Sequence, residues 1–171
     1  MAQFNSLDAR AVANHILTKG VAEGLPIDPM KLLKLTYVAH GWVLGITDQP
    51  LVSQEVCAWP YGPVIADVYD AFKRFRYLPI DSFAMKFGIS GSVPYPTQLP
   101  DTVEPIVGRV WELYKSYTGL QLSTITHREG SPWEQVTRGK KPEEIRDIPI
   151  PTEIIRNYYK GIALRRGAKN G

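Results

Sequence analysis

The chain has very little cysteine, because Cys57 is the only one among 171 residues. A single cysteine excludes an internal disulfide and a cysteine-rich zinc cluster, and it suits a reducing compartment. Long apolar runs are also missing: the longest apolar stretch, 32–46, contains lysine and histidine and is too short to span a bilayer. Positions 1–10 show no signal peptide. We therefore expect a cytoplasmic protein that does not contact a membrane.

Histidine is scarce, and the motifs of metal and nucleotide sites are missing. His15, His40 and His127 form no i, i+4 pair, and no phosphate-binding glycine loop occurs, so we predict no metal and no cofactor. A hydrolase that uses Cys57 or His127 is an alternative, but Cys57 lies in an apolar run typical of a buried, inert thiol. Ser123 and His127 could hydrogen-bond across one helical turn and so fix a helix end. We predict no catalytic residues and no enzyme activity.

The remaining composition is that of a folded globular protein, with 44% hydrophobic and 22% charged residues. Helical periodicity predicts a mainly α fold: a single compact domain of about six helices, with a small β element between helices 2 and 4. We expect this one domain to cover 1–171, with a core at about 7–163 and a flexible tail at 164–171.

Helix boundary signals are spread along the whole chain. Asp28 and Pro29 form an N-cap and a first helical residue, and they predict a central helix that is apolar nearly all round. Pro63 is expected to open a third helix, while Gly20 and Gly119 are expected to end the first and fourth helices. Further elements are predicted as short helices at 120–127 and after Ser131, a last helix after Thr152, and a short strand at 84–89 within the proline- and glycine-rich segment 77–102.

Three segments combine aromatic residues with glycine, proline and charged residues in unusual density. They are Leu32–Trp42, Ala58–Val64 and Leu122–Trp133. In the second segment Trp59 and Tyr61 flank Pro60, and Gly62 with Pro63 follows. This pattern predicts a rigid turn that carries two large aromatic side chains.

Together the three segments resemble the signature of the Panacea domain family, the helical domain of phage-associated, SocA-like antitoxins. The matching positions are Leu32, Lys34, Leu35, Tyr37, Ala39, Gly41 and Trp42, then Ala58, Trp59, Tyr61, Gly62, Pro63 and Val64, then Leu122, Ser123, Thr126, His127, Glu129, Pro132 and Trp133. The resemblance covers about 12–162 and matches nothing within 77–102. It implies a mainly α domain with a small β element, no catalysis and no cofactor.

The resemblance also implies a function. Its leading form is an antitoxin that neutralises a cognate protein toxin, encoded by the adjacent gene, by direct binding. A related alternative is a protease adaptor that delivers the bound toxin for degradation. We predict that the partner is bound through two rigid turns, at Trp59, Tyr61, Gly62, Pro63, His127, Arg128 and Glu129. The alternative interpretation is that these aromatic, glycine and proline residues hold the fold.

The C-terminal end is basic and suggests one more alternative. No acidic residue follows Glu153, whereas five cations do: Arg156, Lys160, Arg165, Arg166 and Lys169. A phage or mobile-element regulator could use this helix to bind nucleic acid. The patch is small by the standards of nucleic-acid binders, and cations also suit a helix C-terminus, so nucleic acid is the less favoured partner.

Overall fold

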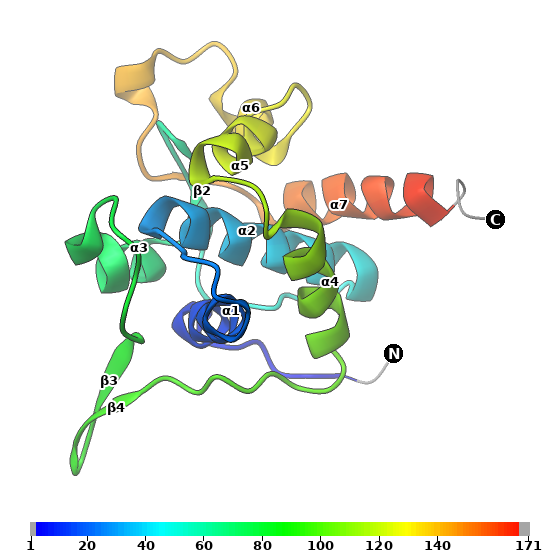
Figure 1. The fold of residues 1–171 in the computed structure, drawn as a ribbon. Coiled ribbons are helices and arrows are strands. Elements are labelled where there is room, and N and C mark those ends of the chain that lie inside the picture. The colour runs from blue at the N-terminus through cyan, green and yellow to red at the C-terminus, as the bar shows by residue number, and fades with distance from the viewer. Residues whose placement is uncertain (1–2, 168–171) are drawn as a thin grey trace.

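Helix α2 (Pro29–Thr47) runs through the middle of the fold, and the other long helices pack around it (Figure 1). The structure is a computed structural model that describes residues 3–167. The side chain of Asp28 accepts a hydrogen bond from the Lys31 amide at 3.0 Å, which confirms the predicted helix start. Every residue from Lys34 to Gly45 is buried, as a central helix requires.

The described residues form seven α-helices and five short strands, which confirms the mainly α fold class. The other helices are α1 (Ala9–Glu23), α3 (Ala66–Phe72), α4 (Glu104–Tyr114), α5 (Gly119–Thr126), α6 (Pro132–Thr137) and α7 (Thr152–Gly167), with short 3-10 turns at Lys73–Phe75 and Pro142–Glu144. None of the helices described is long and apolar enough to cross a membrane.

Helix α7 lies directly against α2 because glycines of α2 face it. A Cβ atom at Gly45 would lie only 2.7 Å from the main-chain nitrogen of Lys160, and Gly41 faces the ring of Tyr159. The Tyr159 ring in turn packs edge-on against Tyr37, with 6.1 Å between ring centroids. The two helices can therefore approach closely only while these positions carry no side chain.

The last helix extends beyond residue 163, the end of the expected core. Helix α7 continues to Gly167, so the segment expected to be a flexible tail from residue 164 onward is helical through that residue. Residues 168–171, which include Lys169, lie outside the described residues. The buried side of α7, which includes Ile155 and Tyr159, packs against α2, whereas the side chains of residues 164–166 are exposed.

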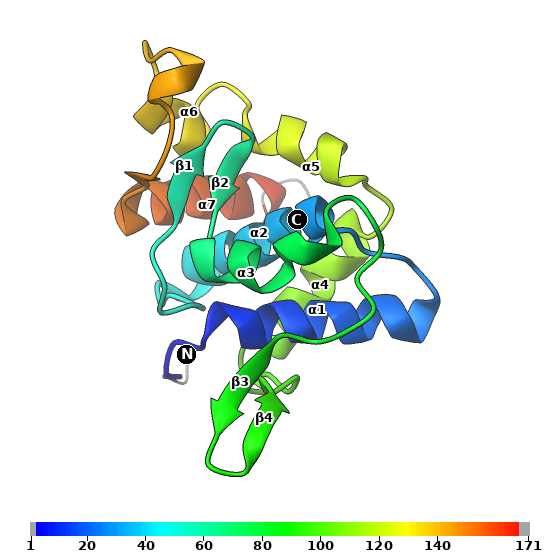
Figure 2. The same ribbon diagram turned by 90° about the vertical axis from the view of Figure 1, so that its left-hand side faces the viewer.

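A three-stranded antiparallel sheet with the order β2-β1-β5 lies beside α2, α5 and α6 (Figure 2). Its strands are β1 (Cys57–Trp59), β2 (Gly62–Val64) and β5 (Ile148–Pro149). Pro63 pairs with Ala58 in edge strand β2, so the prediction that Pro63 opens a helix is wrong. An edge strand tolerates proline because its outer side needs no N–H donor.

The hairpin of β3 (Met85–Gly88) and β4 (Gly91–Pro94) projects away from the helices (Figures 1 and 2). We call it the β-arm. All residues of both strands are exposed, and the side chain of Phe87 is 94% exposed. β3 confirms the predicted strand, and its pairing partner β4 was not expected from the sequence.

A buried asparagine of α1 closes the base of the β-arm. Nδ2 of Asn14 donates to the carbonyl oxygens of Ala84 and Tyr95, at 3.1 Å each, and its Oδ1 accepts from the Ala84 amide at 2.8 Å. The Tyr95 amide also donates to the Ala84 carbonyl at 3.0 Å. The two ends of the arm are thus joined to each other and to the core.

Two of the predicted helix ends are wrong. Helix α1 continues past Gly20 and ends at Gly24, whose φ of 66° is the left-handed conformation typical of a C-cap. Gly20 is instead a packing position, since a Cβ there would lie 2.7 Å from Cδ1 of Ile27. Gly119 begins α5, because the Thr118 side chain caps that helix immediately before it.

Candidate functional site

The three sequence motifs meet at the turn between β1 and β2. Pro60 and Tyr61 form the two-residue loop between the paired residues Trp59 and Gly62. Gly62 has a φ of 110°, in the region that favours glycine. A Cβ atom there would also lie 2.7 Å from Nζ of Lys34. Glycine is therefore required at this position for both conformation and space.

Side chains of the third motif hold the turn by its carbonyl groups. The hydroxyl of Ser123 in α5 donates to the carbonyl oxygen of Tyr61 at 2.9 Å. The indole Nε1 of Trp133 in α6 donates to the carbonyl oxygen of Trp59 at 2.8 Å. These bonds satisfy main-chain acceptors and tie the turn to two helices.

His127 lies directly behind the same turn. Its Nδ1 is 2.6 Å from the carbonyl oxygen of Ser123, and its Nε2 is 3.3 Å from the carbonyl oxygen of Pro60. Its ring packs against Trp133, with 4.0 Å between ring centroids. The expected hydrogen bond between Ser123 and His127 is confirmed: the histidine ring meets the main chain of Ser123, while the serine hydroxyl reaches the turn.

Lys34 of the first motif, in α2, also holds the turn by a hydrogen bond. Its Nζ donates to the carbonyl oxygen of Pro63 at 3.0 Å, and the residue is only 1% exposed. Within the described residues its ammonium group forms no ion pair. Burial without a carboxylate disfavours the charged form and lowers the pKa of Lys34 to about 7.

The Trp59 side chain faces outward from the turn and is held from two sides. Its Nε1 donates to Oδ1 of Asp147 at 2.8 Å. Its ring meets the ring of Tyr69 of α3 edge-on, with centroids 4.9 Å apart. The indole therefore forms a fixed wall rather than a freely rotating surface group.

Beside this wall lies an apolar groove of about 350 Å³, which we call the turn groove. Its apolar lining comes from the start of α2, from the turn and its strands, and from α3, and comprises Pro29, Met30, Leu33, Trp59, Pro60, Tyr61, Val64 and Tyr69. Lys73 and Arg76 supply positive charge to the groove. The Tyr61 side chain is 71% exposed, although the main chain that carries it is fixed.

The structure separates the seven predicted partner-binding residues into four groups. Trp59 and Tyr61 line the turn groove, and Gly62 and Pro63 are buried beneath it. His127 supports the turn from behind. Arg128 and Glu129 are exposed but lie outside the groove lining, and Arg128 lines a different cavity.

The hydrolase alternative gains no support from the geometry of Cys57. Burial, together with the nearby Glu55 carboxylate, raises the pKa of the Cys57 thiol to about 11. The thiol contacts Glu55, with 3.6 Å between sulfur and oxygen, while both ring nitrogens of His127 face carbonyl oxygens. Among residues 3–167, no cluster of three or more His, Cys, Asp or Glu side chains is arranged to hold a metal ion.

Two contacts that build the site were not predicted from the sequence, although both residues match the signature. Lys34 stands in a helix that is apolar nearly all round, and a lysine in that setting signals a buried amine with a specific acceptor. Ser123 shows no comparable signal, because its acceptor lies 62 residues away along the chain.

The fold and the site define a mainly α domain whose signature side chains build a rigid β-turn beside an apolar groove. The chain matches the family described as "Antitoxin SocA-like, Panacea domain" over residues 32–134, and it belongs to that family. It is 35% identical over 157 residues to "Antitoxin SocA" of Caulobacter vibrioides (strain NA1000 / CB15N), an alignment that covers 91% of this chain and 84% of the relative. No solved structure matches the chain significantly.

Proposed function

We propose that this chain is an antitoxin that binds a cognate protein toxin directly and that the turn groove receives the toxin. Membership of the antitoxin family supports the general role. The observation that carries the location is Tyr61, a largely exposed aromatic side chain on a turn whose main chain is already fixed. An anchor of this kind loses little conformational entropy on binding, and tyrosine is enriched among residues that dominate binding energy.

The lining of the groove indicates the chemistry of the toxin segment. Apolar walls favour an inserted aliphatic or aromatic side chain. Arg76 forms no ion pair among the residues described, whereas Lys73 is paired with Asp70 at 2.7 Å. An acidic residue beside the inserted side chain would therefore pair with Arg76, and we expect the toxin segment to be apolar with an acidic flank.

Nucleic acid is the weaker candidate for the partner, because acidic residues already pair with part of the basic C-terminal helix. Nζ of Lys160 lies 2.9 Å from Oδ2 of Asp48, and Nε of Arg156 lies 4.0 Å from Oδ1 of the same residue. Two of the cations expected to bind phosphate are thus engaged within the fold. A strong salt dependence, as for phosphate contacts, is not expected for this chain.

The test is coexpression with the protein encoded by the adjacent gene. We expect relief of growth arrest and copurification of the two proteins. Tyr61→Ala should weaken the purified complex about 30-fold or more in Kd, equivalent to about 2 kcal/mol, because it removes the anchor. Its folding should be unchanged, since only the main chain of Tyr61 bonds to α5.

Phe87→Ala is the matched control, because it removes another exposed aromatic side chain, this one from the β-arm. Full binding by Tyr61→Ala with loss of binding by Phe87→Ala would move the interface from the groove to the arm. If the protein encoded by the adjacent gene neither arrests growth nor copurifies with this chain, the antitoxin role is contradicted for that gene pair. If the level of toxin protein falls while its transcript level stays constant, and no complex accumulates, the result favours the protease-adaptor alternative.

A further inference from the structure

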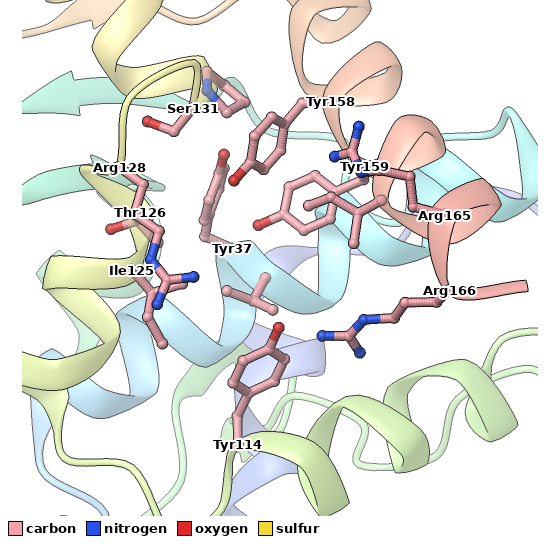
Figure 3. A pocket seen from close by; sticks show the side chains of 13 residues that line it. Tyr37, Tyr114, Ile125, Thr126, Arg128, Ser131, Tyr158, Tyr159, Arg165 and Arg166 are labelled. Atoms are coloured by element: carbon pink, nitrogen blue, oxygen red, sulfur yellow. The ribbon is translucent and has the colours of Figure 1, made fainter. Parts of the chain in front are cut away.

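A second cavity, of about 250 Å³, is lined by four tyrosines and three arginines together with six smaller apolar or hydroxyl-bearing residues (Figure 3). We call it the Tyr/Arg pocket. Its walls come from α2, α4 and α7, and from the end of α5, the start of α6 and the loop between them. The protein-binding proposal does not use this cavity, and its lining shares no residue with the turn groove.

Tyrosine hydroxyl groups supply hydrogen-bond donors within the pocket. Tyr37 and Tyr159 are buried, while Tyr114 and Tyr158 are half-buried. Figure 3 shows the hydroxyls of Tyr114, Tyr158 and Tyr159 directed into the space between the helices. Burial raises the pKa of Tyr37, Tyr158 and Tyr159, so these phenols are protonated at neutral pH. The hydroxyls of Tyr37 and Tyr159 hydrogen-bond to each other, and that of Tyr158 can donate to a ligand.

Three guanidinium groups surround the same space: those of Arg128, Arg165 and Arg166. The pocket lining contains no acidic residue, and none of the three arginines forms an ion pair within residues 3–167. The same helix elsewhere pairs its cations, as Lys160 does with Asp48. Arg166 also lies over the Trp42 ring, 5.0 Å from its centroid, which holds its side chain against α2.

This arrangement concentrates positive potential and donors where no protein anion balances them. Three like charges around one cavity repel each other, and a bound anion would relieve that repulsion. A carboxylate has one charge and two oxygens, whereas a phosphate monoester has up to two charges and three terminal oxygens. Several arginines and phenols together suit the phosphate monoester better than the carboxylate, because guanidinium groups bind phosphate in a bidentate manner.

We propose that the Tyr/Arg pocket binds the phosphate group of a small phosphate monoester. The cavity volume corresponds to roughly eight water molecules at about 30 Å³ each. This space is larger than one phosphate group but too small for a long chain. The ligand is therefore a small molecule whose remaining atoms lie against the tyrosine rings, rather than a polymer.

The test is isothermal titration of the full chain with phenyl phosphate, inorganic phosphate and benzoate at one constant ionic strength. We expect saturable binding of phenyl phosphate at one site, accompanied by a rise in Tm, and binding of benzoate at least tenfold weaker. The double variant Arg128→Gln with Arg165→Gln should weaken binding of phenyl phosphate at least tenfold. The double variant Lys140→Gln with Lys141→Gln removes the same two positive charges from an exposed loop and should change nothing.

Tyr158→Phe keeps the ring and removes only one hydroxyl, so it tests the pocket even if the double variant does not fold. It should weaken phosphate binding without lowering the Tm of the free protein. Equal binding of inorganic phosphate and phenyl phosphate would support a phosphate site in this pocket and would identify free phosphate as its ligand. Benzoate that binds as tightly as phenyl phosphate, or binding that the arginine and Tyr158 variants leave unchanged, would overturn the proposal.

Discussion

At the scale of single residues, the β1–β2 turn is fixed by side chains that come from three different helices. Lys34 of α2, Ser123 of α5 and Trp133 of α6 each donate to a different carbonyl oxygen of the segment. The turn is only two residues long, so few of its own contacts can hold it. Its conformation therefore depends on distant donors, and loss of one donor should be measurable.

We predict that Ser123→Ala lowers the free energy of unfolding by about 1–2 kcal/mol, because the Tyr61 carbonyl then loses its side-chain donor. Urea unfolding followed by circular dichroism measures this change. Thr124→Ala is the control: the Thr124 hydroxyl bonds only within α5, to Leu120, and its side chain is exposed. We expect a change within about 0.5 kcal/mol there. Equal losses in both variants would contradict the assigned role of Ser123.

The sequence allowed part of this site to be predicted. A rigid aromatic turn at Trp59 and Tyr61 follows from proline and glycine chemistry, which acts locally. The support of that turn by His127 was not predicted, because the histidine meets Pro60 across 67 residues of chain. Local rules assign turns and caps, while such contacts depend on how the helices pack.

At the scale of elements, the close approach of α7 to α2 rests on glycine. Gly41 and Gly45 leave room for the main chain and side chains of α7, and the larger ring of Tyr159 fills the space between. A side chain at these positions would have to push a helix, because the nearest atoms at Gly45 belong to the main chain of α7. Interiors packed at this density transmit such a displacement to their neighbours.

We predict that Gly45→Ala lowers Tm by about 5 °C or more, although alanine favours a helix intrinsically by about 1 kcal/mol. The matched variant is Gly161→Ala in α7. There a Cβ atom would find its nearest neighbour, Nη1 of Arg165, at 3.6 Å, an ordinary contact distance. We expect that Tm is unchanged or rises. Differential scanning calorimetry of both variants checks the pair, and a stabilised Gly45→Ala would rule out the close-packing account.

Element boundaries were predicted best where the residues at the boundary favour only one local structure. Asp28 followed by Pro29 predicted the start of α2 correctly, since both residues favour the same structure. Pro63 and Gly20 were misinterpreted because proline suits a helix start or an edge strand, and glycine suits a helix end or a close contact. Tertiary packing decided between these options: Pro63 pairs with β1, and Gly20 contacts Ile27.

At the scale of the whole molecule, two buried bases link stability to pH. Burial lowers the pKa of Lys34 to about 7 and that of His40 to about 4, from ordinary values of 10.5 and 6.5. Between the folded and ordinary pKa of each group, the unfolded chain binds more protons than the folded chain. The free energy of unfolding therefore falls as the pH drops. Lys34 contributes to this fall between pH 10.5 and pH 7. His40 contributes between pH 6.5 and pH 4.

We predict that the free energy of unfolding falls by about 2 kcal/mol between pH 8.5 and pH 7, at up to about 1.4 kcal/mol per pH unit. Lys34→Met should abolish most of this slope, whatever its effect on absolute stability. Lys140→Met, at an exposed position, should retain it. Guanidinium unfolding at several pH values measures the slope. A flat profile in the unmodified chain would show that Lys34 stays charged in the fold.

The Asn14 clamp at the base of the β-arm has a consequence for how such a chain can diverge. Its hydrogen bonds end at Ala84 and Tyr95, so the ten residues between them contribute nothing to the closure. Evolution can lengthen, shorten or rewrite the arm while the helices remain unchanged. Descendants of one ancestor could thus share a scaffold and differ in this protruding segment, which also makes it a suitable insertion point for a fluorescent or affinity module.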